Sequence, residues 1–288
     1  MSMIRVAALA IVVLSGCDAS FFGEASPDFD NPFTLGEVTV LQPAELAGIS
    51  ALAASQRHPG ALYGLEQGSG QAQIVSFNDD GDGQGRILLQ DEQRGLWQDL
   101  AMRDEALLIL TSDGDLGRIL RIPEPRDPPP FAAELTVEQE LQFTLPDAAP
   151  SSCFGLASAA EGGPLWLLCA NNSLYRLNAE FEAPEPLQAV AEGVFAPRVD
   201  IGSQRDFSLS PGGEFGLLTG SIAALVVQRR SEADPQWARE VNGQPEEIRW
   251  QGADFANPRS GHFAFNSVLV YLAAPDQPQG RLFAIFTP

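Results

Sequence analysis

Residues 49–77, ISALAASQRHPGALYGLEQGSGQAQIVSF, contain three short apolar stretches separated by polar or glycine-rich turns. The first stretch is ISALA, the second is ALYGL and the third is QIVSF. Stretches this short, flanked by Gly, Pro and polar residues and without a helical period, indicate strands. The segment therefore predicts three consecutive strands joined by tight turns.

The same succession of three stretches returns along the chain. Its leading leucines are 48, 56 and 53 residues apart, at Leu52, Leu100, Leu156 and Leu209. The second stretch of each copy is almost continuously apolar, as expected of a strand that is buried on both faces. A fifth, looser copy runs from about Arg249 through SVLVYLAAPDQPQGRLFAIF.

Repeats of about 50 residues, each made of three or four short strands, are typical of β-propellers. We therefore expect an all-β chain with one domain over residues 37–288, built as a propeller of five blades. Residues 36–42, GEVTVLQ, precede the first copy, and the last copy ends after its third strand. Pairing these two ends would complete one blade and remove two free edges. A β-sandwich with the same number of strands is the alternative.

The first 17 residues, MSMIRVAALAIVVLSGC, have the composition of an export signal. Their apolar run is about half of the ~20 residues that a spanning helix needs. LSGC, residues 14–17, resembles the bacterial lipobox, in which the cysteine is acylated and the preceding segment is removed. The resemblance implies a signal peptide over residues 1–16 and an N-terminal Cys17 that carries fatty acyl chains such as palmitate. Residues 17–36 have no hydrophobic period, and we expect an exposed, lipidated tether there.

The charge of the chain restricts its partners. The sequence has 17 basic and 38 acidic residues, a net charge of −21, and removal of Arg5 with the signal makes the balance 16 − 38 = −22. Such a chain repels nucleic acid and anionic head groups, so we expect membrane contact through the acyl chains at Cys17 alone. We expect a lipid-anchored protein of the bacterial cell envelope with its body outside the cytoplasm. The choice between inner and outer membrane stays open.

Two cysteines remain once Cys17 is assigned to lipid. Cys153 and Cys169 form an even pair in an exported chain, which is the setting in which disulfides persist. A bridge between them would enclose 15 intervening residues. Two buried free thiols are the alternative.

Three stretches within residues 48–125 resemble a group of exported bacterial propeller proteins: GISALAASQRHPGALYG, LWQDLAMRD and DGDLGRILRIPEP. In the group the first stretch continues into an HNDSG-like segment, the second reads WEDLA, and the third has GDN, an arginine and a VPEP-like end. The chain keeps eight residues of this pattern, namely Arg57, His58, Pro59, Trp97, Asp99, Asp115, Arg118 and Pro123.

The departures from that pattern fall on polar positions. The HNDSG-like segment is GLEQGSG here, Gln98 replaces the glutamate, and Leu116 replaces the asparagine. The resemblance implies a propeller fold. These substitutions imply that a metal or hydrolytic site of the group has lost polar groups in this chain.

Metal ligands are sparse in the sequence. Only His58 and His262 are histidines, whereas zinc sites need three or four close ligands. His58 precedes Pro59 and Gly60, so we interpret it as a turn residue. We found no Gly-rich phosphate loop, nucleophile elbow or C-x-x-C motif.

Residues 77–86, FNDDGDGQGR, match the first ligand positions of a calcium loop through Asn78, Asp80 and Asp82. The twelfth position, which should hold a bidentate glutamate, is Leu89. Because the segment joins two strand-like stretches, its Asp-Gly dipeptides favour a hairpin turn. We expect no cofactor, with weak calcium binding at these three residues as the alternative.

Three acids stand at or near the start of a predicted first strand: Asp99, Asp206 and Asp254. Propellers usually bind ligands at the mouth of the central channel, which the first strands line. We expect these acids to give that mouth a negative charge suited to a cation or a basic partner. The predicted function is an envelope-anchored binding or scaffolding module for an unidentified protein or small molecule. The alternative is a calcium-dependent propeller hydrolase that uses channel carboxylates.

Overall fold

The protein is represented by a computed structural model. It describes residues 34–40, 49–66, 73–90, 97–113, 115–127, 131–159, 162–170, 173–178, 181, 183, 185–194, 204–213, 215–220, 223–229, 237–238, 240–241, 244–245, 247–249, 260–263, 269–274 and 281–286. These residues form strands, with one short 3₁₀ helix at Pro150–Ser152. The predicted all-β class is confirmed. Among the described residues, no helix is long and apolar enough to cross a bilayer.

The strands form five sheets of four or five strands each and a two-stranded sheet of β20 (Glu240–Val241) and β21 (Gln244–Pro245). In spatial order, the first sheet contains β2 Ile49–Ala54, β3 Ala61–Glu66, β4 Gln73–Asn78, β5 Gly83–Leu89 and β9 Phe131–Leu135. The second contains β6 Asp99–Arg103, β7 Ala106–Asp113, β8 Leu116–Pro123, β10 Gln139–Thr144 and β14 Leu187–Gln188.

In the remaining three sheets, successive strands along the chain also pair antiparallel. The third contains β11 Cys153–Ala157, β12 Leu165–Cys169, β13 Ser173–Leu177 and β15 Val190–Val194. The fourth contains β16 Gln204–Leu209, β17 Phe215–Gly220 and β18 Ala223–Arg229, with β19 Trp237–Ala238 and β22 Glu247–Arg249 both paired to β18. The fifth contains β23 Ser260–Phe263, β24 Leu269–Ala274, β25 Arg281–Phe286 and β1 Thr34–Val40.

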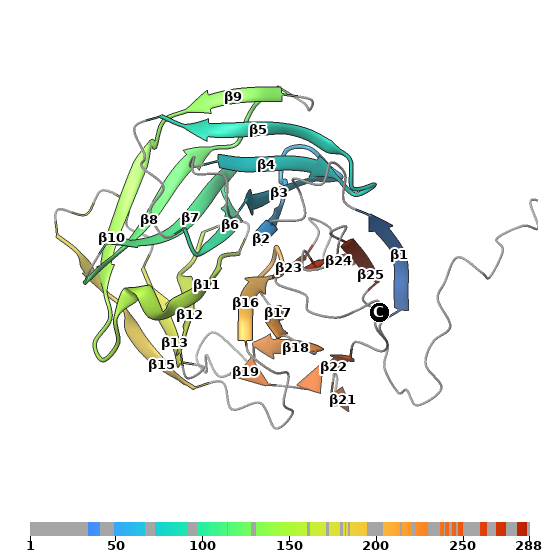
Figure 1. The fold of residues 1–288 in the computed structure, drawn as a ribbon. Coiled ribbons are helices and arrows are strands. Elements are labelled where there is room, and N and C mark those ends of the chain that lie inside the picture. The colour runs from blue at the N-terminus through green and yellow to red at the C-terminus, as the bar shows by residue number, and fades with distance from the viewer. Residues whose placement is uncertain are drawn as a thin grey trace, which may run out of the picture.

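The first strand of each sheet lies next to the first strands of two other sheets. Strand β2 contacts β6 and β23, β11 contacts β6 and β16, and β16 contacts β23. Figure 1 shows these five strands near the centre of the molecule, with the later strands of each sheet farther out. Residues that open a first strand therefore lie close to residues from other repeats.

Apolar side chains fill the spaces between neighbouring sheets. The first two sheets share a cluster that includes Tyr63, Leu65, Ile87, Leu107 and Ile122. The second and third share one around Leu110, Phe143, Leu167 and Tyr175, and the third and fourth share one around Trp166, Phe207 and Leu218. The second strands β3, β7, β12 and β17 are buried over almost their whole length, and β7 and β12 each contribute to a cluster on both faces. This confirms the double burial that their apolar composition predicted.

Two strands join a sheet other than the one to which the flanking strands belong. Strand β9 lies between β8 and β10 in sequence but pairs with β5 in parallel. Strand β14 lies between β13 and β15 in sequence and pairs with β10 in parallel. Both cover the outer edge of the preceding sheet and join it by backbone hydrogen bonds to the next repeat. The sequence did not predict them.

The pairing registers correct two boundaries of the predicted repeats. Leu156 pairs with Leu167, and the residue in the same place of the fourth sheet is Phe207, which pairs with Leu218. The repeat position predicted for Leu209 was therefore two residues too late. The first strand of the fifth sheet begins at Ser260, whereas the sequence suggested a fifth copy from about Arg249, a residue that belongs to β22.

The predicted pairing of the N-terminal strand with the last strand is confirmed. Strand β1 runs antiparallel to β25 with Thr34 opposite Phe286 and Val40 opposite Arg281. It begins at Thr34, inside the segment 17–36 that we had interpreted as tether, because its backbone pairs with β25 there. Residues 1–33, including Cys17, lie outside the described residues.

Replacing Gly117 with alanine should destabilise the second sheet. Gly117 pairs with Phe143 across the strands, and a Cβ at position 117 would lie 2.2 Å from Phe143 Cζ. Because Phe143 is fully buried and its ring has little room to move, we expect the free energy of unfolding to fall by about 1–3 kcal/mol in urea denaturation. The loss should be smaller in a Phe143→Leu background. An equal loss in both backgrounds would contradict the contact.

Candidate functional site

Two of the three predicted channel acids meet in the interior. Asp99 opens β6 opposite Leu110, and Asp206 lies near the start of β16 opposite Thr219. In β16 a β-bulge precedes Asp206, because Gln204 and Asp206 face the successive residues Gly220 and Thr219. The registers place Ala51 of β2 and Gly155 of β11 at the same repeat position. The two acids are therefore equivalent residues of the second and fourth sheets.

The carboxyl groups of these acids form a buried pair. Asp99 is 1% exposed and Asp206 is 3% exposed. The backbone N–H of Leu156 donates to Asp99 Oδ2, and the two carboxyl groups are joined by a hydrogen bond. Burial, followed by the charge of Asp206, raises the pKa of Asp99 well above its usual range. Asp99 therefore keeps its proton to a higher pH than an exposed aspartate does.

A glycine allows the strands that carry this pair to approach each other. A Cβ on Gly155 would lie 3.0 Å from the backbone nitrogen of Phe207, the residue after Asp206. Its neighbour Leu156 is the donor to Asp99. Three sheets are thus connected at one point: the second and fourth by the hydrogen bond between the two carboxyl groups, and the third through the backbone N–H of Leu156.

This arrangement corrects the expectation of a negatively charged mouth. Asp99 and Asp206 do lie on first strands, but both are buried and bonded to each other instead of facing solvent. Asp254 lies outside the described residues. Two more buried groups on β16 and β17, the hydroxyls of Ser208 and Thr219, have no hydrogen-bond partner in the described part of the chain.

A second buried acid, Glu124, connects the two ends of the stretch that resembles exported propeller proteins. Glu124 stands in the PEP segment after β8 and is 2% exposed. Its Oε1 accepts hydrogen bonds from Ser55 Oγ and from Tyr63 OH at 3.2 Å, and its Oε2 accepts one from Arg57 N at 3.2 Å. Burial and the Glu124 charge raise the pKa of Tyr63. Sequence reasoning did not select Glu124, although an acid between two prolines at the end of a strand was a visible signal.

The HPG segment forms the turn between β2 and β3. His58 N donates to Ser55 Oγ at 2.7 Å, and His58 O accepts from Ala61 N at 2.9 Å. Gly60 has a φ of 82°, which an L-residue with a side chain rarely adopts. A hydrogen bond of 2.9 Å joins His58 Nε2 and Pro125 O. The interpretation of His58 as a turn residue is confirmed, and the HPG and PEP motifs are partners in one hydrogen-bond network.

The candidate calcium segment is a hairpin turn between β4 and β5. Asn78 N donates to Asp82 O, Gly81 N donates to Asn78 O, and Gly81 has a φ of 78°. Asn78 Oδ1 accepts from Asp82 N at 2.7 Å, so this side chain already closes the turn. The side chains of Asp80 and Asp82 are exposed. Within the described ranges, no three His, Cys, Asp or Glu side chains are grouped as metal ligands would be.

A cavity of about 310 Å³ lies between the HPG turn and this hairpin. The turn contributes residues 57–61, and the hairpin contributes Asn78, Asp79 and Gln84. A backbone hydrogen bond of 3.1 Å from Asp79 N to Gly60 O joins the two walls. The sequence did not predict this cavity, because its two walls come from different turns.

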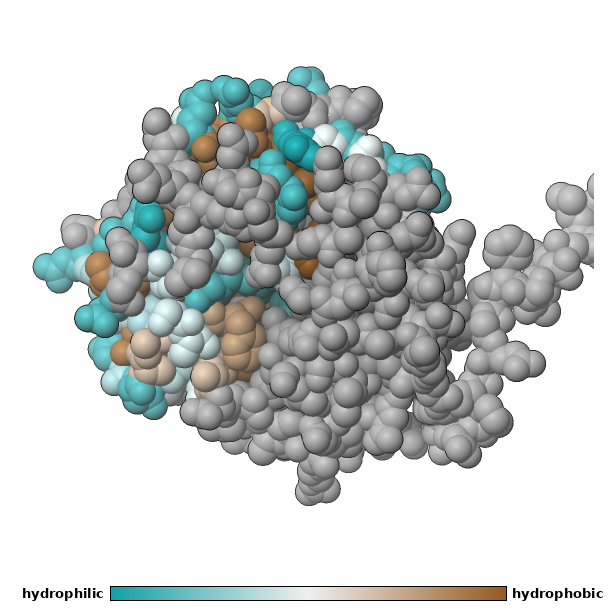
Figure 2. Space-filling model, in the orientation of Figure 1, coloured by the Kyte–Doolittle hydropathy of each residue, from teal (hydrophilic) through white to brown (hydrophobic). Residues whose placement is uncertain are grey.

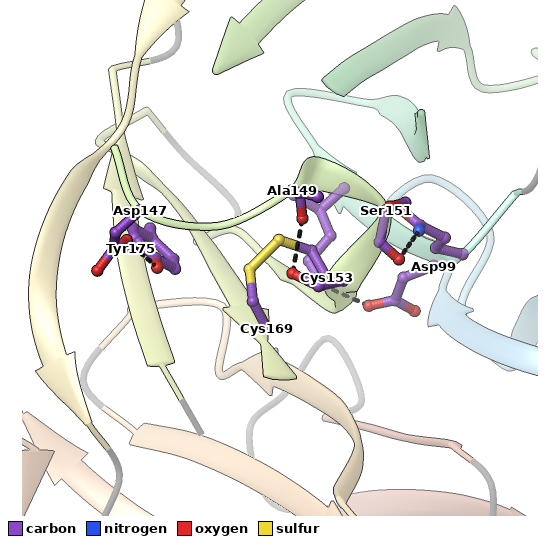
Figure 3. The surroundings of a disulfide bond; sticks show 10 residues. Asp99, Asp147, Ala149, Ser151, Cys153, Cys169 and Tyr175 are labelled. Atoms are coloured by element: carbon purple, nitrogen blue, oxygen red, sulfur yellow. Dashed lines mark hydrogen bonds between the residues drawn. A yellow bond between two sulfur atoms is a disulfide. The ribbon is translucent and has the colours of Figure 1, made fainter. Parts of the chain in front are cut away.

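Cys153 and Cys169 form a disulfide between opposite residues of β11 and β12. Figure 3 shows the bridge with Asp99 and Ser151 on one side and the pair Tyr175–Asp147 on the other. Tyr175 OH donates to Asp147 Oδ1 at 2.6 Å, and Gln98 Nε2 donates to Ser151 O at 3.0 Å. The bridge therefore stabilises the start of β11, the strand whose Leu156 binds Asp99.

Other residues of the resembled pattern have structural contacts. Arg118 makes two hydrogen bonds to the Glu140 carboxylate, at 2.9 Å and 2.7 Å, which lower the pKa of Glu140. Trp97 packs against the apolar cluster of the first two sheets. Asp115 is exposed in the turn before β8.

No protein-family model and no curated protein matches the chain. Among solved structures, a proposed 6-phosphogluconolactonase from Bacteroides uniformis is 14% identical over 88% of this chain and 70% of its own length, with a TM-score of 0.41. A chain of the mitotic checkpoint complex is 15% identical over 83% of this chain and 62% of its own length, with a TM-score of 0.40. A protein from Lactobacillus plantarum is 13% identical over 78% of this chain and 63% of its own length, with a TM-score of 0.39. Similarity at this level carries no argument about what this chain binds or catalyses.

The Asp99–Asp206 pair should make stability fall as pH rises. Folded Asp99 keeps its proton at pH values where unfolded Asp99, with an ordinary pKa of 3.8, has lost it. The free energy of unfolding should therefore decline between that pKa and the raised one, by roughly 1.4 kcal/mol for each unit of the increase. In Asp99→Asn, the amide can accept a hydrogen bond from Leu156 N and donate one to Asp206, but it does not titrate. The free energy of unfolding of this variant should therefore decline less than that of the wild type between pH 4 and pH 8.

The control for this experiment is Asp104→Asn, which changes an exposed acid that follows the same strand. Its free energy of unfolding should vary with pH as the wild type does. If Asp99→Asn and wild type lose the same amount of stability between pH 4 and pH 8, the pKa of Asp99 is not raised in the folded state.

Removing the disulfide should lower stability without unfolding the chain at room temperature. In the chain-entropy model, a loop of this length contributes about 3 kcal/mol. We expect Cys153→Ala/Cys169→Ala to lose about that amount in denaturant unfolding of the oxidised protein. The intact mass of the unreduced wild type should be smaller than that of the reduced form by two hydrogens. Equal masses would contradict the bridge.

Proposed function

We propose that this chain is an acyl-anchored lipoprotein of the bacterial cell envelope whose body is a single five-bladed β-propeller. The observation that carries the propeller is the cyclic order of contacts between first strands: β2 with β6, β6 with β11, β11 with β16, β16 with β23, and β23 with β2. Each first strand belongs to a different sheet. In this proposal each of the five sheets is a blade, and β1 completes the last one.

The proposed role of the propeller is to bind or scaffold a partner outside the cytoplasm. The interior acids favour a binding module over the alternative hydrolase. Asp99 and Asp206 are buried, and they form hydrogen bonds with each other and with the backbone N–H of Leu156. A hydrolase that used channel carboxylates would present them to its substrate. The cavity beside the HPG turn does present polar groups at the surface.

The surface is consistent with anchoring by lipid. Among the described residues, Val190 is the exposed large hydrophobic side chain, at 52%. On the face in Figure 2, the described residues are mainly hydrophilic, and hydrophobic ones appear as separate small areas. With a net charge of −21 in the full sequence, such a body gains little from contact with an anionic bilayer. The proposal therefore assigns attachment to acyl chains at Cys17.

Metabolic labelling with an alkyne fatty acid tests the anchor. Cells that produce the full chain should incorporate the label into the wild type and lose it in Cys17→Ala, because the other cysteines are in the folded body. Cys153→Ala/Cys169→Ala should be labelled as strongly as wild type, and both labelled proteins should sediment with membranes. Equal labelling of wild type and Cys17→Ala would overturn the lipoprotein proposal.

A further inference from the structure

Both cysteines of the disulfide lie inside the folded chain. Cys153 is 1% exposed and Cys169 is 0% exposed. Both belong to the apolar cluster shared by the second and third sheets, in which Leu110 of β7 and Phe143 of β10 come from the second sheet. An oxidant can therefore reach the sulfur atoms only while the second sheet is not packed against the third.

The surroundings of the bridge are closed by further contacts. The 3₁₀ helix Pro150–Ser152, which directly precedes β11, contacts β7 and β8. Ser151 O accepts a hydrogen bond of 3.0 Å from Gln98 Nε2. Tyr175 OH donates to Asp147 Oδ1 at 2.6 Å, and Figure 3 shows Ser151 and this pair on opposite sides of the bridge. Opening a path to the sulfur atoms requires breaking contacts between two sheets.

The pairing of the two cysteines is, by contrast, local. Cys153 and Cys169 are opposite residues of the β11–β12 hairpin, and the same pairing continues through Leu156 and Leu167. The two cysteines are 16 positions apart in the sequence. A β-hairpin forms in about 1–10 μs, before strands from distant parts of a chain are assembled. The hairpin alone can therefore bring the two thiols together.

We propose that a thiol–disulfide oxidoreductase outside the cytoplasm makes this bridge in the β11–β12 hairpin before the second sheet packs against the third. The thiolate of one cysteine attacks the disulfide of the enzyme, which forms a mixed disulfide and releases one enzyme sulfur as a thiolate. The thiolate of the other cysteine then attacks the Sγ of the first. The bridge forms, and the enzyme leaves as a dithiol that has taken up the two electrons and two protons lost by the chain.

The mixed disulfide determines the order of events. An enzyme joined through sulfur to Cys153 or Cys169 would occupy the space that the side chains of the second sheet fill in the folded chain. Oxidation therefore precedes packing, and packing afterwards protects the bridge from reductants. The inference goes beyond the proposed binding role and is independent of the acyl anchor, because it concerns the assembly of the body alone.

Oxidation during and after refolding tests this order. The full mature chain is reduced in urea and diluted into detergent-containing buffer, and oxidant is added either at dilution or after refolding is complete. The probes are oxidised glutathione and a purified bacterial thiol–disulfide oxidoreductase in its disulfide form. Bridge formation is read as the loss of two hydrogens in the intact mass. With either probe, we expect the refolded chain to react at least roughly a hundredfold more slowly, because only about one chain in a hundred or fewer would be open.

An exposed thiol provides the matched control. Asp115→Cys in a Cys153→Ala/Cys169→Ala chain places one thiol in the exposed turn before β8. Oxidised glutathione should modify this thiol equally fast during and after refolding. Phe143→Leu, in a chain that keeps both cysteines, should increase the oxidation rate of the refolded reduced chain roughly tenfold by weakening the cover. An unchanged rate would contradict the second sheet as the cover.

The native disulfide provides a second measurement that does not require the reduced chain to refold. Dithiothreitol should leave the bridge intact until urea reaches the unfolding transition. Three outcomes would overturn the inference: oxidation of the refolded chain as fast as that of the refolding chain, reduction of the native bridge at a rate independent of urea, or an oxidoreductase that leaves the refolding chain reduced.

Discussion

Burial of both faces of the second strands β3, β7, β12 and β17 is the constraint on which the rest of this structure depends. A strand such as β12, with all five residues buried, cannot be stable at a sheet surface that faces water, because its apolar side chains alternate between two faces. It needs a neighbouring sheet on each side. The clusters shared by the first and second, second and third, and third and fourth sheets meet that need. The meeting of the five first strands follows from the same requirement.

Two buried acids in this apolar interior, Asp99 and Glu124, are paired with partners far away in the sequence. Asp99, Asp206 and Leu156 belong to three different sheets, and Glu124 binds residues about seventy positions earlier in the chain. A buried acid without such partners would be costly, so these bonds favour one arrangement of the sheets over others. The HPG and PEP motifs have a common physical explanation, because the Glu124 carboxylate accepts hydrogen bonds from the backbone and side chains of the turn.

Much of the fold could be predicted from patterns along the chain. The apolar stretches around Leu52, Leu100 and Leu156 are first strands, and the hairpin at Asn78–Asp82 is a turn, because local spacing and Asp-Gly chemistry decide such features. The parallel strands β9 and β14 were missed, since edge pairing uses backbone groups that every sequence has. The repeat position of Leu209 was wrong by two residues, because the equivalent residue of β16 is Phe207 and a pattern based on leucine selected the next leucine of the strand.

For the candidate sites, the sequence by itself determined that Asp99 and Asp206 lie at or near the start of a first strand and that residues 78–82 form a turn. It could not determine that Asp99 and Asp206 are buried against each other, or that Arg57 and Gln84 line one cavity. Only the tertiary structure decided these points. The physical reason is that periodicity and turn chemistry act over a few residues, whereas the pKa of an acid and the shape of a cavity depend on neighbours from other repeats. Those neighbours are brought close by packing between sheets, which no local pattern in the sequence records.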